Sequence, residues 1–90
     1  MVNLDLYAWV VRGSQRIAVI KALIHPTTPT LAFKKAKEYH NKISLNNTSS
    51  VLRTLAKMGL VICINDDAKT GRIYELTEEG KEIQDELIRR

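Results

Sequence analysis

The sequence predicts a mainly helical domain with one small β-hairpin near its C-terminal end. Four segments whose apolar residues recur at helical spacing come before any segment of β character. Two short β-branched runs then flank a loop that is rich in turn residues, and a last helical segment follows them. Strands and helices do not alternate along the chain, so we do not expect a parallel sheet.

Length and composition are typical of one small globular domain spanning residues 1–90. Hydrophobic residues make up 44% of the chain and charged residues 27%, which is ordinary for a soluble protein. The formal net charge of +4 favours a polyanionic partner. A single cysteine permits no internal disulfide, and with only two distant histidines it provides no metal site.

Several functional classes are not expected from this sequence. No segment has the pattern of a signal peptide or the roughly 20 apolar residues of a membrane span. We therefore expect a soluble cytoplasmic protein without a membrane partner. The sequence contains no nucleophile elbow, phosphate-binding loop or HExxH pattern, so we expect neither enzyme activity nor a cofactor.

The first helix is expected at residues 3–12. Asn3 is a suitable N-cap for it, and Gly13 suits the position just after its end. The apolar run Tyr7–Val11 would also suit a strand, so a strand is the alternative interpretation of this segment.

The next two helices are expected at residues 14–24 and 29–40. Ser14 can cap the first of them. Thr28 followed by Pro29 is the usual combination of an N-cap with proline in the first helical position, so it marks the start of the second.

A fourth helix is expected at residues 45–58, after an N-cap at Ser44 and before Gly59. The β-branched runs that follow predict a hairpin at residues 60–76, with its turn in the sequence NDDAKTG. A last helix is expected at residues 78–89, where acidic residues in the first turn complement the helix dipole.

The expected helix 45–58 separates its residues cleanly into two faces. The apolar face contains Leu45, Thr48, Val51, Leu52, Leu55, Ala56 and Met58. The polar face contains Asn46, Asn47, Ser49, Ser50, Arg53, Thr54 and Lys57. Such side chains pair with base edges and phosphates, and the absence of acidic residues from 44 to 61 avoids repulsion of phosphates. We therefore predict that the polar face binds DNA; an ordinary solvated face with a frayed start is the alternative.

Basic residues on two neighbouring segments extend this prediction. Lys34 and Lys37 face the same side of the preceding helix, which crosses the DNA backbone in a helix-turn-helix. Lys69 and Arg72 belong to the hairpin and are further candidates for DNA contact. The neighbouring aspartates of the hairpin loop argue against deep insertion of its tip into a groove.

Three stretches, GSQRIAVIKAL, ISLNNTSSVLRTLAKMGLV and GRIYELTEEG, together resemble the winged helix-turn-helix transcription regulators of the ArsR-like and MarR-like group. The resemblance extends over about residues 12–82. It implies a winged helix-turn-helix fold and sequence-specific regulation of transcription on double-stranded DNA, with helix 45–58 in the major groove. The metal-binding cysteine box of many ArsR-like sensors is absent, so metal sensing is not implied. The segment between the two motif helices looks longer than usual.

We also expect a homodimer. Apolar residues at the two ends of the chain exceed what a small core needs, and they place the interface at Leu6, Trp9, Val10, Ile83 and Leu87. The main alternative function is a winged helix that docks to protein within a larger assembly, and a second is RNA binding. Exposed aliphatic or aromatic side chains on helix 45–58 would favour the first, and exposed clustered aromatic residues the second.

Overall fold

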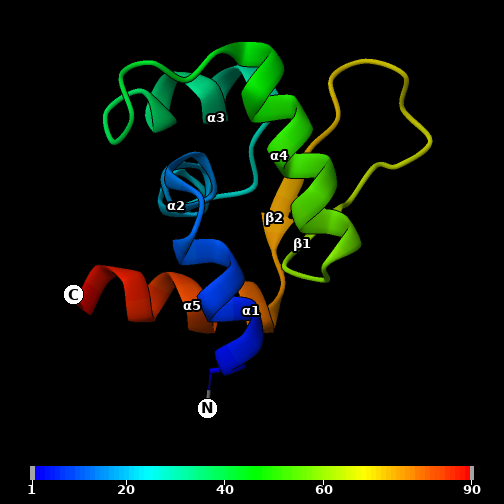
Figure 1. The fold of residues 1–90 in the computed structure, drawn as a ribbon. Coiled ribbons are helices and arrows are strands. Elements are labelled where there is room, and N and C mark those ends of the chain that lie inside the picture. Colours follow the sequence, from blue (N-terminus) through cyan, green and yellow to red (C-terminus); the bar gives the residue numbers. More distant parts are fainter. Residues whose placement is uncertain (1, 90) are drawn as a thin grey trace.

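The computed structural model describes residues 2–89, and within that range the chain forms five helices and one two-stranded antiparallel sheet (Figure 1). The elements follow one another as α1 (Leu4–Val11), α2 (Ser14–Ala22), α3 (Pro29–Ala36), α4 (Leu45–Lys57), β1 (Val61–Cys63), β2 (Tyr74–Leu76) and α5 (Glu78–Arg89). The predicted fold class, mainly helical with a small hairpin, is confirmed, and the arrangement is consistent with a winged helix.

Side-chain caps fix the start of most of the helices. A side-chain oxygen accepts a hydrogen bond from a backbone N–H of the first turn at each of Asn3, Thr28, Ser44 and Thr77. The predicted cap at Ser14 is wrong, because Ser14 is already helical and Gly13 is the N-cap of α2 without a side-chain bond.

Several elements are shorter than predicted. Helix α3 ends at Ala36 and not at residue 40. After Ala36 the N–H of Tyr39 donates to the Ala36 carbonyl at 2.9 Å, which is a turn over three residues and not the four-residue spacing of an α-helix. Helix α2 ends at Ala22, because Leu23 has a ψ of 67°, which is outside the helical range. Leu23 lies two residues before His25, whose helical conformation is disfavoured by Pro26. The paired strands cover only three residues each, so residues 64–73 form a long loop between them.

The core lies where α2 meets the other helices, and buried residues of the hairpin complete it. Helix α2 packs against α1, α3, α4 and α5, and it is seen almost end-on in the middle of Figure 1. The largest fully buried side chains come from several elements: Val10, Val19, Ile20, Thr48, Leu52, Leu55, Leu60 and Ile83. One continuous core of this kind is what a single domain of this size requires.

Three residues predicted at a dimer interface belong to this core instead. Val10 and Ile83 are 0% exposed and Leu87 is 7% exposed within the single chain. Leu6 and Trp9 are half-buried against the same core. The prediction is wrong for Val10, Ile83 and Leu87, because these three side chains pack inside the domain and are not accessible to a partner.

The end of α2 is completed by a side chain of α5. Gln84 Nε2 donates to the carbonyl oxygens of Ile20 at 2.8 Å and Leu23 at 3.1 Å. A buried carbonyl without a partner costs about 1–3 kcal/mol, so this amide stabilises the contact between the two helices.

A single residue pair extends the sheet beyond the hairpin. Thr27 and Tyr74 exchange two backbone hydrogen bonds, at 2.9 Å and 2.8 Å. Because β1 pairs with the other edge of β2, the backbone order is Thr27, β2, β1. This pair fixes the start of α3 next to the hairpin. The turn-rich sequence around Thr27 does not predict the pair.

The end of α4 and the start of α5 meet at one tightly packed point. Gly59 has a φ of 80° and ends α4, as predicted for the position after a helix. Thr77 donates from its hydroxyl to the Gly59 carbonyl at 2.7 Å and from its N–H to the Leu60 carbonyl at 3.0 Å. Gly80 packs against the same Leu60 carbonyl so closely that a Cβ there would overlap the oxygen.

Candidate nucleic-acid interface

Helix α4 has the two faces that the sequence predicts, except at its ends. Thr48, Leu52 and Leu55 are completely buried against the core. Leu45 and Met58 were placed on the apolar face, but they are 41% and 37% exposed. They lie at the two ends of the helix, beyond the reach of the core. The polar face is exposed along most of its length.

Part of the polar sequence at the start of α4 serves the helix itself. Asn47 Oδ1 accepts from the N–H of Ser44 at 3.3 Å, and Ser44 Oγ accepts from the N–H of Asn47 at 3.0 Å. This reciprocal pair satisfies backbone donors that a helix start leaves unpaired. The hydroxyl of Thr48 donates to the Ser44 carbonyl at 2.9 Å. The start of α4 is therefore capped, and the interpretation of a frayed start is wrong.

The remaining polar residues of α4 are the candidates for contact with a partner. Thr54 is exposed, but its hydroxyl donates to the Ser50 carbonyl at 3.1 Å, within the helix. The other exposed side chains of this face are Asn46, Ser50, Arg53 and Lys57, and Ser49 is half-buried beside them. Amide, hydroxyl and cationic groups are thus presented together on one side of one helix.

An open groove of about 470 Å³ lies between α4, the start of α3 and the hairpin loop. Its lining consists of Thr28, Pro29, Thr30, Leu45, Ser49, Arg53, Lys69, Thr70, Gly71, Arg72 and Tyr74. Three of these residues are cations and none is a carboxylate. The groove therefore combines positive charge with hydroxyl groups, which suits phosphate oxygens. It brings together the predicted candidates Arg53, which belongs to α4, and Lys69 and Arg72, which belong to the hairpin loop.

The hairpin loop is held in shape by two of its own side chains. Asn65 Nδ2 donates to the Gly71 carbonyl at 3.1 Å across the base of the loop. The Arg72 guanidinium donates to the carbonyls of Ala68 at 2.9 Å and Asp66 at 3.2 Å. The Arg72 guanidinium is therefore partly used in hydrogen bonds within the loop. Lys69, at the tip of the loop, also lines the groove.

The lysines of α3 differ in their surroundings. Lys34 is exposed, and Lys37 lies just after the end of α3 with its Nζ 5.4 Å from the centre of the Phe33 ring. Lys35 is half-buried and pairs with Glu38 at 3.2 Å. The predicted phosphate contacts Lys34 and Lys37 are thus exposed, whereas Lys35 has a partner within the chain.

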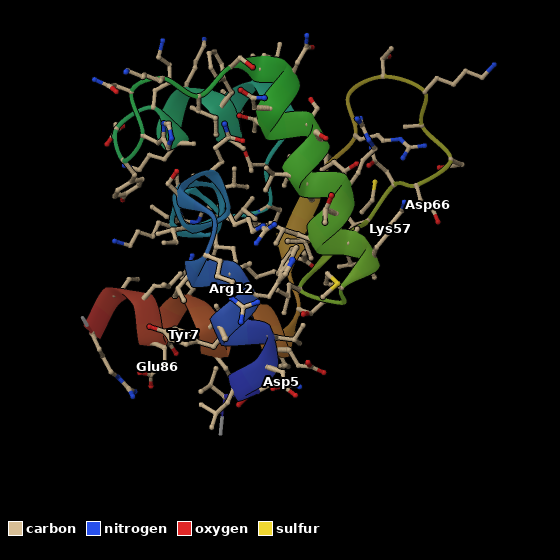
Figure 2. All side chains as sticks on the ribbon, viewed as in Figure 1. Asp5, Tyr7, Arg12, Lys57, Asp66 and Glu86 are labelled. Carbon is tan, nitrogen blue, oxygen red and sulfur yellow. The ribbon has the colours of Figure 1, made fainter. Side chains whose placement is uncertain are left out.

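Cations predominate on α3 and α4, and carboxylates predominate on α5. Helices α3 and α4 contain cations and no acidic residue, whereas α5 contains Lys81 and Arg89 together with five carboxylates: Glu78, Glu79, Glu82, Asp85 and Glu86. Figure 2 shows Lys57 projecting from the end of α4 on the side of the hairpin loop, whereas Glu86 projects from α5 far from that loop. A polyanion would therefore be attracted more strongly to α3 and α4 than to α5.

Neither the family models nor the curated proteins contain a match to this chain. Of the helices within residues 2–89, none has the length and apolar character needed to cross a membrane.

Proposed function

We propose that this protein is a winged helix-turn-helix regulator of transcription, of the ArsR-like or MarR-like type, that binds double-stranded DNA with α4 in the major groove. The observation that supports this most is the groove beside α4, in which Arg53, Lys69 and Arg72 meet without any carboxylate. A surface selected only for solubility would mix acidic residues with these cations.

The residues divide into two kinds of contact in this proposal. The amide and hydroxyl groups of Asn46 and Ser50, together with the Arg53 guanidinium, have the chemistry to pair with base edges. Lys34, Lys37 and Lys57 neutralise phosphates, and Lys69 does so from the loop. Leu45 and Met58, the two exposed apolar residues at the ends of α4, are too few to form the apolar centre of a protein-docking face.

The decisive experiment is a fluorescence-anisotropy titration of labelled random-sequence duplex DNA at two salt concentrations, with single-stranded DNA and duplex RNA of equal length alongside. We expect the duplex DNA to bind more tightly than the others. We also expect its affinity to fall steeply with salt, because each neutralised phosphate contributes about 0.9 to the slope of log affinity against log salt. Absence of duplex binding at low salt would refute the proposal, and tighter binding of RNA would replace it with the RNA alternative.

The double substitution Lys34→Ala, Lys37→Ala should flatten that salt slope by up to about two units per subunit, since two phosphate contacts are removed. Affinity for specific and random duplexes should fall together, because phosphates carry no sequence information. Lys81→Ala, on the acidic helix α5, is the matched control and should leave the slope unchanged. A folded double variant with the wild-type slope would exclude α3 from the DNA contact.

Arg53→Ala should weaken binding to the preferred duplex by about 1–3 kcal/mol, as expected for loss of a contact to a guanine edge. The preferred sequence is first selected from a random library with the wild type. Titration of that duplex with the wild type and with Arg53→Ala then measures the loss of affinity. Lys57→Ala is the comparison, and it should weaken all duplexes to a similar degree. An equal loss for every sequence in Arg53→Ala would show that Arg53 holds a phosphate in the groove and does not identify a base.

A further inference from the structure

The hairpin loop, residues 64–73, contains as many carboxylates as cations. Asp66 and Asp67 lie in its first half, residues 64–68, and Lys69 and Arg72 lie in its second half, residues 69–73. These formal charges cancel, so a loop without a fixed orientation would not attract a polyanion. What the loop contributes to DNA binding therefore depends on which half lies beside the groove at α4.

The structure places the two halves of the loop differently. The loop residues that line the groove run from Lys69 to Arg72, and neither aspartate is among them. Both aspartates are exposed. Figure 2 shows Asp66 at the level of Lys57, near the end of α4, whereas the groove reaches the start of α4 at Leu45. The cationic half of the loop thus borders the groove, and the acidic half does not.

Asn65 closes the base of the loop with both polar atoms of its side chain. Its Oδ1 accepts from the N–H of Ile73 at 2.7 Å, so a side chain takes the place of a backbone acceptor at the end of the sheet. Its Nδ2 donates to the carbonyl of Gly71 at 3.1 Å, where the φ of 67° suits glycine. The two ends of segment 66–70 are therefore tied to one residue next to β1.

Arg72 holds the same segment at two further points. Its Nε donates to the carbonyl of Ala68 at 2.9 Å, and its Nη2 donates to the carbonyl of Asp66 at 3.2 Å. A guanidinium can hold two acceptors at once because its donors form a planar fork, and bonds from a charged donor are stronger than neutral ones. A lysine at this position would keep the charge but not the fork.

We propose that Asn65 and Arg72 are positioning residues for the DNA contact of the loop. They keep the half that contains Lys69 beside the groove and the half that contains the aspartates away from it. This inference rests on the proposed DNA binding, and it changes the role predicted for Arg72 from direct contact to support of the loop. Without the two residues, Asp66 and Asp67 can approach the phosphates, and their repulsion offsets the attraction by Lys69.

A double-mutant cycle on the affinity for random-sequence duplex DNA tests the role of Asn65. Asn65→Ala should weaken binding by a factor of about 5–10 at about 0.1 M salt, because the phosphate contact of the loop is lost. Lys69→Ala should cause a similar loss. The loss in the combined variant should be clearly smaller than the product of the two, since Asn65 acts through Lys69. Asn41→Ala, at an exposed asparagine between α3 and α4, is the matched control and should bind like the wild type.

Arg72→Lys distinguishes support of the loop from a contact made by charge alone. It should weaken duplex binding about as much as Asn65→Ala, because it retains the charge and loses the fork. Binding as tight as that of the wild type would overturn the role proposed for Arg72.

Backbone ¹⁵N relaxation of the chain without DNA measures the positioning directly. In the wild type, the amides of Lys69 and Thr70 should be nearly as ordered as those of α4. In Asn65→Ala and Arg72→Lys they should become mobile on the picosecond to nanosecond timescale, while the helices remain unchanged.

The two measurements separate this proposal from the proposed function. A loop that stays ordered in both variants, or losses that multiply in the cycle, would overturn the positioning role while leaving DNA binding intact. A wild type that binds no duplex would refute the proposed function, and the relaxation measurement would still decide whether Asn65 and Arg72 hold the loop.

Discussion

Gly80→Ala should lower the free energy of unfolding by about 3 kcal/mol, although alanine is the better helix former by up to about 1 kcal/mol. The added Cβ would overlap the Leu60 carbonyl oxygen, which is backbone and cannot rotate away. Helix α5 would have to move, and the hydrogen bond from Thr77 to that carbonyl would be lost. A chain of this size has only about 5–13 kcal/mol of stability in total, so the loss is large.

Urea denaturation followed by circular dichroism measures this change. Glu79→Ala, at the preceding exposed residue of α5, is the control, and it should change stability by less than about 1 kcal/mol. The opposite sign, with Gly80→Ala more stable than the wild type, would mean that helix propensity outweighs packing and that α5 does not approach Leu60 as described.

Ile83→Ala should destabilise the chain by about 2–5 kcal/mol, because it removes a fully buried side chain and leaves a cavity. Ile83 is 0% exposed, among core residues contributed by other helices. The loss should be the same at 1 µM and at 100 µM protein, since the contacts lie within one chain. Leu4→Ala, at an exposed position of α1, should stay within about 0.5 kcal/mol of the wild type.

The dependence of this loss of stability on protein concentration distinguishes a core residue from an interface residue. If Ile83 contacted a second chain, its truncation would matter little at a concentration where such a dimer was dissociated and strongly at a concentration where it was formed. That pattern would restore the interface predicted from the sequence.

Local signals predicted the order of the elements. Caps at Asn3, Thr28 and Ser44 and the stop at Gly59 depend on residues close to each helix end, so they can be recognised in the sequence alone. The burial of Val10 and Ile83 depends on how α1 and α5 pack around α2, which no local pattern specifies. Apolar residues at the ends of a chain look the same whether they face a core or a partner.

The candidate site was predictable to a similar extent. The spacing of residues in α4 identified its polar face, because a helix repeats every 3.6 residues. The groove was not predictable, since it depends on where a ten-residue loop lies and on the pair formed by Thr27 and Tyr74. The capping by Asn47 was missed because Asn at this position performs the function that Glu or Gln has in the usual capping box.

The bonds from Gln84 to the end of α2 have a consequence for how the chain acquires its structure. They connect residues 64 and 61 positions apart, so helix α2 is completed by a segment that is synthesised late. Contacts of such long sequence separation form slowly, because a large loop must close first. Until α5 is synthesised, the part of α2 that α5 covers is exposed on the nascent chain. The contact between α2 and α5 therefore cannot form during translation until α5 has left the ribosome, and before that the apolar surface that it buries is open to aggregation.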